Sequence, residues 1–546
     1  MFGPDEILAR DSHPLTNTKT PGNAAYQKST PFALAALGRP FAWERDGVII
    51  RSRKSQPEGA AMNNESAVTR RDFLKSSART GAGLAALGGI TFITQPERVF
   101  GANDRVQVAI IGLNGRGGDH IKGFSQLANA QIAALGDVDP RVLDKRLTQM
   151  DKQGLPKPKS YADIRKLLDD KSIDAISIAT PNHWHSLMAI WGCQAGKDVY
   201  VEKPCSHNWW EGKQLVEAAA KYNRIVQHGT QSRSGKGVIE GIKQINDGLI
   251  GEVYLARGLC YKWRDTIGRA SEEPVPSGVN YDLWTGPAPM KPFTRNRFHY
   301  NWHWLWDTGN GDIGNQGVHE MDKARWGLGV KYPTKVSAIG GHFMFDDDQQ
   351  TPNTLNAAFE FVTPDGRRKM LEFEVRHWIT NSEAMIGTKA FGSEGVPAAG
   401  LAAPPPTDAK SAAAKPKTGP DAGSHNVIGN LFCGSKGYIA MSDYDSYKSW
   451  LGKEMEPGPS GHGAGDHYAN FIDCVRSRKK EDLHAPIEEG HISCTLIHLA
   501  NISYRLGRTI HFKPDTQEIN GDKEAMELIR EGDRGYRDPY VVPEKV

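Results

Sequence analysis

The chain has 546 residues, with 67 Lys and Arg against 64 Asp and Glu, which gives a formal net charge of +3. Charged residues make up 24% and hydrophobic residues 38%, which is typical of a soluble globular protein and excludes collagen-like and coiled-coil classes. The six cysteines include no CxxC pair, so a disulfide scaffold and a zinc ribbon are both excluded. No apolar run reaches the ~20 residues of a membrane span, and the near-neutral charge argues against a nucleic-acid partner.

A candidate export signal lies near the start of the sequence. Residues 69–75 read TRRDFLK, and a short, weakly apolar run follows at 81–93. Paired arginines before such a run resemble a twin-arginine signal, so we expect 62–102 to engage the twin-arginine translocase. The protein is then expected to be periplasmic or exported, either soluble or tethered by an uncleaved signal. Residues 1–61 show no periodicity, and we expect a disordered gene-model extension with translation starting at Met62.

A glycine-rich turn follows the first predicted strand, VQVAIIG, at 106–112. In a dinucleotide fold the first glycine makes a tight turn, the middle one lets backbone approach the pyrophosphate, and the third packs helix on strand. Here the outer positions are glycines, but asparagine, which tolerates unusual backbone angles, replaces the middle one. The predicted cofactor-binding residues of this turn are Gly112, Asn114, Gly115, Arg116 and Gly117.

An acidic residue stands where a cofactor ribose would need it. Asp137 ends the second predicted strand, 20 residues beyond Gly117, and can accept hydrogen bonds from the adenosine ribose. This acid favours NAD, although Arg116 and Arg141 leave NADP possible. We therefore predict a dinucleotide-binding domain over 103–232, with an α/β fold and a doubly wound parallel sheet.

Three further strand-like runs follow, at 174–180, 198–204 and 224–230. We expect a turn at 181–185 after the first of them, and then helices between the strands. Ligands of open parallel sheets bind beyond the carboxyl ends of the strands. The residues expected at that edge are, for the cofactor, Pro181, Asn182, His185, Glu202 and Lys203 and, for the substrate, Gln231.

Five motifs in order, IGLNGRGG, DVDP, TPNHWH, VEKP and GNQGVHEMD, resemble the Gfo/Idh/MocA oxidoreductases. The resemblance runs from about residue 105 to about residue 513. It implies an N-terminal Rossmann domain and, at 233–513, a C-terminal α+β domain with an open antiparallel sheet. It also implies a sugar or polyol substrate and a homo-oligomer formed through that sheet.

The same resemblance implies three catalytic positions. Lys203 matches the family's active-site lysine, and an ammonium there can stabilise a developing alkoxide. His319 matches the general base, which takes the hydroxyl proton as hydride leaves carbon. Asn315 stands where the family commonly has aspartate, and an amide can orient a group but cannot relay a proton. Asp312 could compensate if one helix already covers it and His319.

Alternating aromatic residues occupy the segment RFHYNWHWLWD at 297–307. In an extended segment every second side chain shares a face, so we expect one aromatic face, partly buried and partly in contact with substrate. Trp302 and Trp304 are the predicted substrate contacts. The opposite face would hold His299 and His303.

No metal site is expected. His183 with His185 and His299 with His303 are the pairs that could suggest one, but no carboxylate and cysteine set completes either pair.

The remaining sequence fits the second domain. Strand-like runs between 335 and 378 predict its sheet, and two amphipathic helices follow near 466–479 and 491–508. We expect His491 and His498, on one face of the second helix, to pack against the dinucleotide domain. The Ala, Pro and Lys-rich stretch 396–424 is expected to be a disordered insertion, and 514–546 a surface-docked tail.

Three functions remain open at this stage. An exported dehydrogenase would meet little free nucleotide, so the leading hypothesis is a sugar or polyol oxidoreductase whose NAD(P) is tightly bound and recycled. The alternative is a redox-neutral glycosidase or lyase, in which oxidation to a ketone acidifies the adjacent C–H and permits elimination. A non-catalytic carbohydrate-binding protein is the third possibility, disfavoured by the presence of both Lys203 and His319.

Overall fold

The computed structural model describes residues 105–378, 381–388, 391, 426–530 and 535–546. The expected extension at 1–61, the expected signal at 62–102 and the expected insertion at 396–424 lie outside the described residues. Within the described part, no helix has both the length and the apolar character needed to cross a bilayer.

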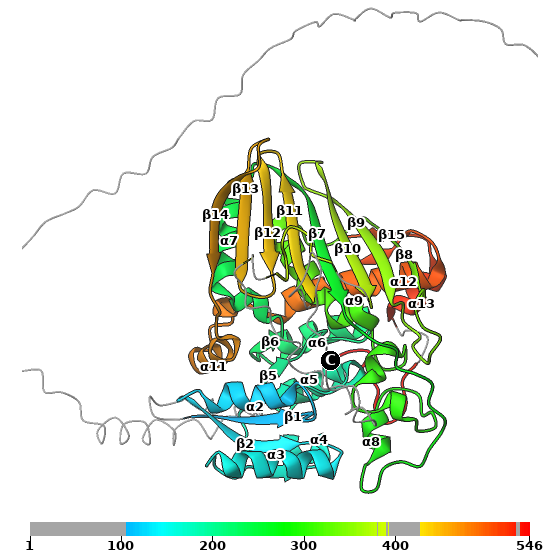
Figure 1. The fold of residues 1–546 in the computed structure, drawn as a ribbon. Coiled ribbons are helices and arrows are strands. Elements are labelled where there is room, and N and C mark those ends of the chain that lie inside the picture. The colour runs from blue at the N-terminus through cyan, green and yellow to red at the C-terminus, as the bar shows by residue number, and fades with distance from the viewer. Residues whose placement is uncertain (1–104, 379–380, 389–390, 392–425, 531–534) are drawn as a thin grey trace, which may run out of the picture. The chain divides into compact units, whose positions relative to one another are not determined.

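The first half of the described chain is the predicted parallel sheet (Figure 1). Its order is β3-β2-β1-β4-β5-β6, so the chain starts in the middle, moves to one edge, returns and continues to the other edge. The central strands are Val- and Ile-rich and buried, as expected when both faces are covered by helices. The strands are β1 Val106–Ile111, β2 Ala130–Gly136, β3 Lys159–Tyr161, β4 Ala175–Ile178, β5 Asp198–Val201 and β6 Val226–His228.

Helices connect these strands, and one begins earlier than predicted. The expected turn at 181–185 is wrong, because α5 begins at Asn182, directly after Pro181. Pro181 has φ −60° and extended ψ, which suits the position before a helix. The helices are α2 Gly117–Ser125, α3 Pro140–Lys152, α4 Ile164–Leu168, α5 Asn182–Gln194 and α6 Trp209–Lys221.

The second half is built on a ten-stranded sheet with order β14-β13-β12-β11-β7-β10-β9-β8-β15-β16. The predicted antiparallel pairing holds for every pair except β7 with β10, which run parallel, so the sheet is mixed. The strands are β7 Val253–Lys262, β8 Lys335–Gly341, β9 Thr354–Val362, β10 Arg368–His377, β11 Val427–Gly434, β12 Gly437–Ser442, β13 Ser446–Leu451, β14 Glu456–His462, β15 Ile510–Lys513 and β16 Glu518–Ile519.

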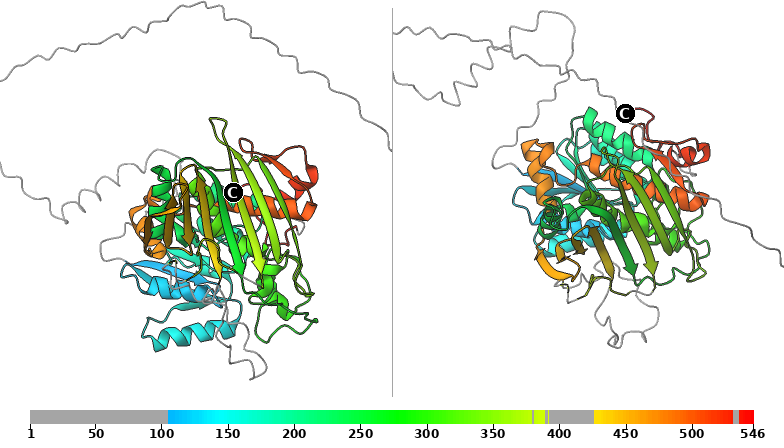
Figure 2. Two further views of the ribbon diagram at one scale, coloured as in Figure 1. Left: turned by 45° about the horizontal axis from the view of Figure 1, so that its top comes forward. Right: turned by 90° about the horizontal axis from the view of Figure 1, so that it is seen from above.

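Helices pack on one face of this larger sheet (Figure 2). In β9 alternate residues are buried, which gives that face its apolar surface. The helices and 3-10 turns of this half are η1 Gln231–Ser234, α7 Lys236–Asn246, α8 Tyr281–Thr285, η2 Arg295–Arg297, η3 Asn301–Trp304, α9 Gly311–Asn315, α10 Gly317–Leu328, α11 His467–Ser477, η5 Lys480–Asp482, α12 Ile487–Leu506 and α13 Lys523–Arg530.

The long helix α12 joins the two halves, because it contacts both α6 and β8. His491 packs against Trp209, with ring centroids 5.8 Å apart, and a Cβ at Gly212 would lie 2.5 Å from its ring. His498 Nε2 lies 3.1 Å from Ser206 Oγ. The predicted packing of these two histidines against the dinucleotide-binding half is therefore confirmed.

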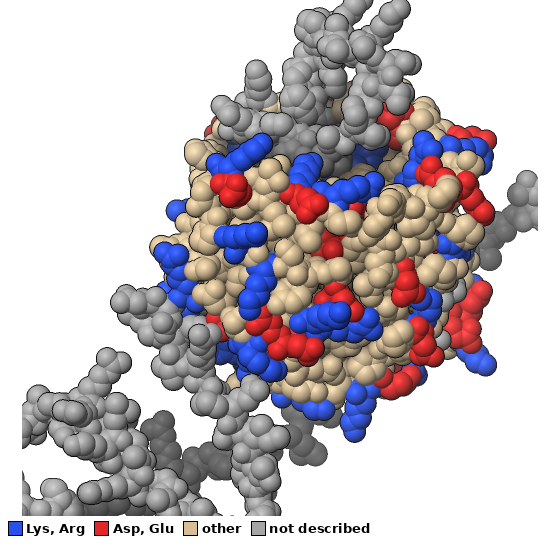
Figure 3. Space-filling view, turned by 90° about the horizontal axis from the view of Figure 1, so that it is seen from below, with Lys and Arg blue, Asp and Glu red and all other residues tan. Residues whose placement is uncertain are grey.

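The segment expected to be a tail adds to the fold. β16 pairs with β15, and α13 packs against α6 and α12. Val542 and Val546 are buried in the main hydrophobic core. The face seen from below carries positive and negative side chains interspersed, in keeping with the small net charge (Figure 3).

Candidate active site

A cavity of about 960 Å³ runs from the glycine-rich turn to the start of α10. This volume is at the upper end of the range for small-molecule and cofactor sites. Of the predicted site residues, Gly117, Trp304 and Asp312 do not border the cavity. The predicted residues that do are Gly112, Asn114, Gly115, Arg116, Asp137, Pro181, Asn182, His185, Glu202, Lys203, Gln231, Trp302, Asn315 and His319.

The two outer glycines of the turn are sterically required. Gly112 has φ +83°, and a Cβ there would lie 2.7 Å from the backbone of Ala179. A Cβ at Gly117 would lie 2.0 Å from the carbonyl oxygen of Gly112. Gly115, in contrast, has nothing within 4 Å of its added Cβ, so it leaves open space above the turn. A bare turn leading into the start of α2 fits a bound pyrophosphate.

Asp137 lies at the cavity edge with its carboxylate held by backbone. Its Oδ2 accepts a hydrogen bond from the amide of Leu113 at 2.8 Å, and its Oδ1 accepts one from the amide of Asp139 at 2.9 Å. Burial raises the pKa of Asp137 to about 6. The turn and this acid together fit the NAD predicted from the sequence.

Glu202 fastens the glycine-rich turn to the loop that carries the active-site lysine. Its Oε1 accepts hydrogen bonds from Arg116 Nε at 2.8 Å, His120 Nε2 at 3.0 Å and Gln231 Nε2 at 3.1 Å. Burial alone would raise the pKa of Glu202, but Arg116 and His120 hold it well below its usual range. Arg116 is therefore already paired, which weakens its predicted role toward a 2'-phosphate.

Lys203 and Asn315 are in direct contact, which the sequence had not indicated. Lys203 Nζ donates to the carbonyl oxygen of Asn315 at 2.5 Å and to its Oδ1 at 3.1 Å. Burial is the main cause that lowers the pKa of Lys203 to about 8. The charge of Glu202 opposes this shift, and the charges of Lys262 and Arg116 add to it. The ammonium is therefore charged near neutral pH but close to its titration range.

His319 projects from the first turn of α10 and borders the cavity. Only 2% of its surface is exposed, and its buried Nδ1 has no hydrogen-bond partner among the residues that the structure describes. The ring packs edge-on against Tyr444, with centroids 5.0 Å apart. Burial and the charge of Lys203 lower its pKa well below the usual range, so the imidazole is neutral and able to accept a proton.

The proposed compensation by Asp312 is wrong. Gln316 separates α9 from α10, so Asp312 and His319 do not share one helix. The carboxylate of Asp312 instead accepts hydrogen bonds from Arg264 at 2.5 and 3.0 Å and pairs with His377 at 2.6 Å. It also accepts one from Asn315 Nδ2 at 3.1 Å, so it positions the amide that holds Lys203.

The prediction that the aromatic segment 297–307 is extended is also wrong. The segment contains the two 3-10 turns η2 and η3, in which successive side chains point about a third of a turn apart, and the link between them turns at His299, whose φ is +63°. His299, Tyr300, Trp302 and His303 consequently all border the cavity. Trp302 stacks on His303, with ring centroids 3.6 Å apart.

Trp304 was predicted to contact substrate, but it lies away from the cavity. Only 2% of it is exposed, and the Arg264 guanidinium lies 4.8 Å from its ring centroid. Its ring also packs edge-on against His377 at 5.8 Å. Trp304 therefore packs against Arg264 and His377, the two residues that pair with Asp312.

His185 borders the cavity, but its ring nitrogens face the protein. Nδ1 lies 2.6 Å from the carbonyl oxygen of Pro204, and Nε2 lies 2.7 Å from that of Thr180. Burial lowers its pKa to about 4, so the ring is neutral. The ring thereby holds the loops after β4 and β5 together, and its predicted contact with the cofactor stays a prediction.

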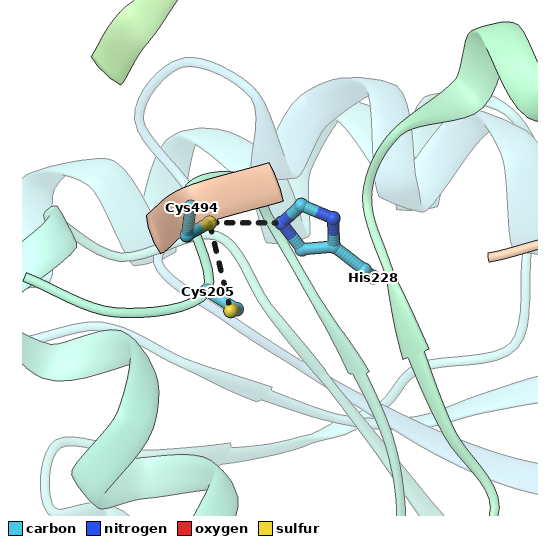
Figure 4. A group of neighbouring side chains, drawn as sticks. All are labelled: Cys205, His228 and Cys494. Carbon is cyan, nitrogen blue, oxygen red and sulfur yellow. Dashed lines mark hydrogen bonds between the residues drawn. The ribbon is translucent and has the colours of Figure 1, made fainter. Parts of the chain in front are cut away.

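One cluster in the described part of the chain brings together side chains of the kind that bind metals: Cys205, His228 and Cys494 (Figure 4). The two sulfurs are 3.7 Å apart, and Cys494 Sγ lies 3.9 Å from His228 Nε2. His228 Nδ1 continues the chain to Thr230 Oγ1 at 3.3 Å. Three donors are one fewer than a structural zinc site uses, and these contacts form a buried hydrogen-bond chain that ties the Lys203 loop to α12.

The sequence reasoning missed the wall at the adenosine end of the cavity. Tyr540 reaches this wall from the segment 535–546 and donates its hydroxyl to Asp282 Oδ2 at 3.0 Å. Arg537 binds the other oxygen of Asp282 at 2.5 Å. The Tyr540 ring packs on Trp184 at 5.3 Å and lies 5.7 Å from the Arg165 guanidinium.

Two residues at the reacting end were missed as well. Lys262, at the end of β7, and Tyr444, in the turn after β12, both border the cavity. Neither lies in a recognisable motif, so no sequence signal marked them.

Two family models match the chain, both from the Gfo/Idh/MocA group. The oxidoreductase family model for the NAD-binding Rossmann fold matches residues 106–230. The oxidoreductase family model for the C-terminal alpha/beta domain matches residues 238–363 and 440–540.

Similar curated proteins carry glycosidase names. A glycosyl hydrolase family 109 protein of Shewanella pealeana is 34% identical over 154 residues, which are 28% of this chain and 34% of the relative. An alpha-N-acetylgalactosaminidase of Shewanella oneidensis is 28% identical over 203 residues, covering 34% of this chain and 44% of the relative. The chain thus matches less than half the length of these relatives.

Solved structures share the fold. The aldose-aldose oxidoreductase of Caulobacter crescentus, complexed with glycerol, has a TM-score of 0.51 and 19% identity, covering 75% of this chain and 100% of that one. A levoglucosan dehydrogenase in complex with NADH and L-sorbose has a TM-score of 0.53 and 15% identity, covering 75% and 99%. With both family models in their expected order on this fold, the chain belongs to the Gfo/Idh/MocA oxidoreductase family and is an NAD-dependent enzyme.

Proposed function

We propose that the protein oxidises a hydroxyl group of a sugar or polyol and keeps its NAD bound between turnovers. The observation that carries this proposal is that an ammonium and a neutral imidazole, those of Lys203 and His319, border the same cavity as the glycine-rich turn. Bound NAD supplies the hydride acceptor and can return the hydride.

Each residue has a defined part in the reaction. His319 accepts the hydroxyl proton, which its lowered pKa permits near neutral pH. The Lys203 ammonium donates a hydrogen bond to the same oxygen and stabilises its developing negative charge. Asn315 holds the ammonium through two oxygen atoms, and Asp312 in turn holds the Asn315 amide.

One structural observation and one expectation from the sequence favour retention and recycling of the cofactor. The adenosine end is bordered by the buried ring of Tyr540, whose hydroxyl is bound to Asp282 of α8, and this ring would have to move before the nucleotide could leave on that side. The export signal expected at 62–102 favours the same interpretation, since a protein outside the cytoplasm meets little free nucleotide.

The test begins with the purified protein. Denaturation should release NAD in close to stoichiometric amount, identified by mass spectrometry. A substrate sugar should then convert the bound cofactor to NADH, seen by absorbance, and an added ketose should reverse the change. Protein that takes up no pyridine nucleotide, or that shows no spectral change with any sugar or polyol, would refute the proposal.

The second candidate is redox-neutral cleavage of a glycosidic or similar substituent. Asn315 favours it, because an amide in place of the family's aspartate gives His319 no carboxylate partner to pass its proton onward. The glycosidase names of the Shewanella relatives point the same way. In this cycle the substrate loses a hydride, the adjacent C–H loses a proton, the substituent leaves, and the hydride returns after water has added.

These two candidates differ in product. Cleavage would release the substituent without net NADH, and it would exchange the hydrogen on the carbon next to the ketone with solvent deuterium. Simple oxidoreduction would leave the substituent in place and that hydrogen unexchanged. Mass spectrometry of products formed in heavy water distinguishes them.

A further inference from the structure

Two lysine ammoniums at the reacting end of the cavity have no carboxylate partner within the described part of the chain. Lys262 Nζ donates to Gln316 Oε1 at 2.6 Å, and the acceptors recorded there for Lys203 Nζ both belong to Asn315. Among the described residues, no carboxylate oxygen lies within 4.0 Å of either ammonium. The two charges are close enough that Lys262 lowers the pKa of Lys203.

The amide that holds Lys262 has a fixed orientation. Gln316 Nε2 donates to both oxygens of Glu320 at 3.2 Å and also lies 3.2 Å from the Tyr444 hydroxyl. Its oxygen therefore has to face Lys262. Each ammonium carries three N–H groups, so Lys262, with one described acceptor, has two left for a molecule in the cavity.

The acidic side chains around this end are already occupied. Glu320 lies behind Gln316, where burial raises its pKa to about 7 although Lys323 opposes this. A bound oxidised nicotinamide ring adds a further positive charge. The other nearby carboxylates have these partners: Asp312 with Arg264, Glu202 with Arg116, and Asp443 with Ser442.

We propose that the sugar substrate carries a carboxylate group and that Lys262 is the residue that binds it. This inference rests on the proposed sugar oxidoreduction and names its substrate class. In the proposed reaction Lys203 binds the reacting oxygen, whereas Lys262, the last residue of β7, has two N–H groups left for a second group of the substrate. An anion there relieves the repulsion between the two ammoniums and gains charge-assisted hydrogen bonds.

Binding to the NADH-loaded enzyme, measured by calorimetry, tests this without requiring turnover. D-glucuronate should bind about tenfold or more tighter than D-glucose, and D-galacturonate than D-galactose, as expected for hydrogen bonds to a charged group. Lys262→Met should bring each ratio close to one, and Lys262→Arg should keep most of it. Lys243→Met is the matched control, because that lysine pairs with Asp247 on the surface of α7.

Several results would overturn the inference. They are equal binding of uronate and neutral sugar by the unmodified enzyme, an undiminished preference in Lys262→Met, and tighter binding of glucose 6-phosphate than of glucuronate. Circular dichroism checks that Lys262→Met is folded, and the Arg variant provides the comparison if it is not. A clear uronate preference without any sugar-dependent NADH signal would support this inference and refute the proposed function, so the two fail separately.

Discussion

The two ends of the cavity differ in whether their polar groups are hydrogen-bonded within the protein. At the adenosine end, the rings of Tyr540 and Trp184 border the cavity and pack on each other, and the Tyr540 hydroxyl is bound to Asp282, which also pairs with Arg537. At the reacting end, His319 has a buried nitrogen without a partner and Lys262 has spare donors. Polar groups that are hydrogen-bonded within the protein make a wall costly to open, whereas polar groups with spare hydrogen-bonding capacity can bind a ligand. The adenosine end is therefore suited to hold the cofactor, and the reacting end to exchange substrate.

Replacing His319 should have the largest effect at the reacting end. In His319→Ala the hydroxyl proton has no acceptor, and we expect kcat to fall by about 10²- to 10⁴-fold. Bound nucleotide should remain, because no residue of the adenosine wall is changed. Loss of bound NAD together with activity would show that the two ends are not independent.

Lys203→Met should follow, with a fall in kcat of about 10²- to 10³-fold from loss of one donor to the developing alkoxide. Single-turnover formation of bound NADH measures the chemical step directly. Undiminished turnover would remove Lys203 from the mechanism.

The adenosine wall should respond through a different quantity. In Tyr540→Ala we expect NADH to dissociate about tenfold faster, since most such changes appear in the off-rate. The rate is measured by the loss of energy transfer from tryptophan to NADH after addition of excess NAD. Tyr540→Phe keeps the ring and loses only the hydrogen bond to Asp282. Its rate of NADH dissociation should therefore lie between those of the unmodified enzyme and Tyr540→Ala.

Reduced nicotinamide mononucleotide, which lacks adenosine, gives the control for this prediction. Its dissociation should be the same in the unmodified enzyme and in Tyr540→Ala. An equal effect on both nucleotides would mean that the whole cavity is distorted.

The pH dependence of activity should depend on residues of the reacting end alone, and its effect should be the smallest of those predicted here. Lys203 must be protonated to donate, so activity should fall as the pH rises through about 8, by about tenfold per unit beyond it. His319 must be neutral, and since its pKa is lowered, activity should persist well below pH 6.5. Nucleotide retention should stay constant over this range.

The motif-bearing parts of the site could be predicted from sequence because their constraints are local. Gly117 is required by its contact with Gly112 in the same turn, Gly112 has the positive φ of +83° that the turn demands, and Lys203 and His319 lie in recognisable motifs. The parallel sheet followed likewise from runs of buried Val and Ile.

The errors concern residues whose environment is set by distant parts of the chain. Alternating aromatics predicted an extended segment, yet the segment folds into 3-10 turns that bury Trp304 against Arg264 and His377. Cys205 and Cys494 touch across 289 positions, and Tyr540 meets Trp184 across a still longer separation. No local pattern encodes such contacts.

The position of Tyr540 has a consequence for assembly. The glycine-rich turn is synthesised near the beginning of the described chain, but the wall opposite the adenosine site is completed only when residue 540 has emerged from the ribosome. A nascent chain could therefore form the Rossmann sheet and sample nucleotide weakly before residue 540 has been synthesised. The proposed firm retention of NAD therefore requires synthesis through residue 540, late in the production of the chain.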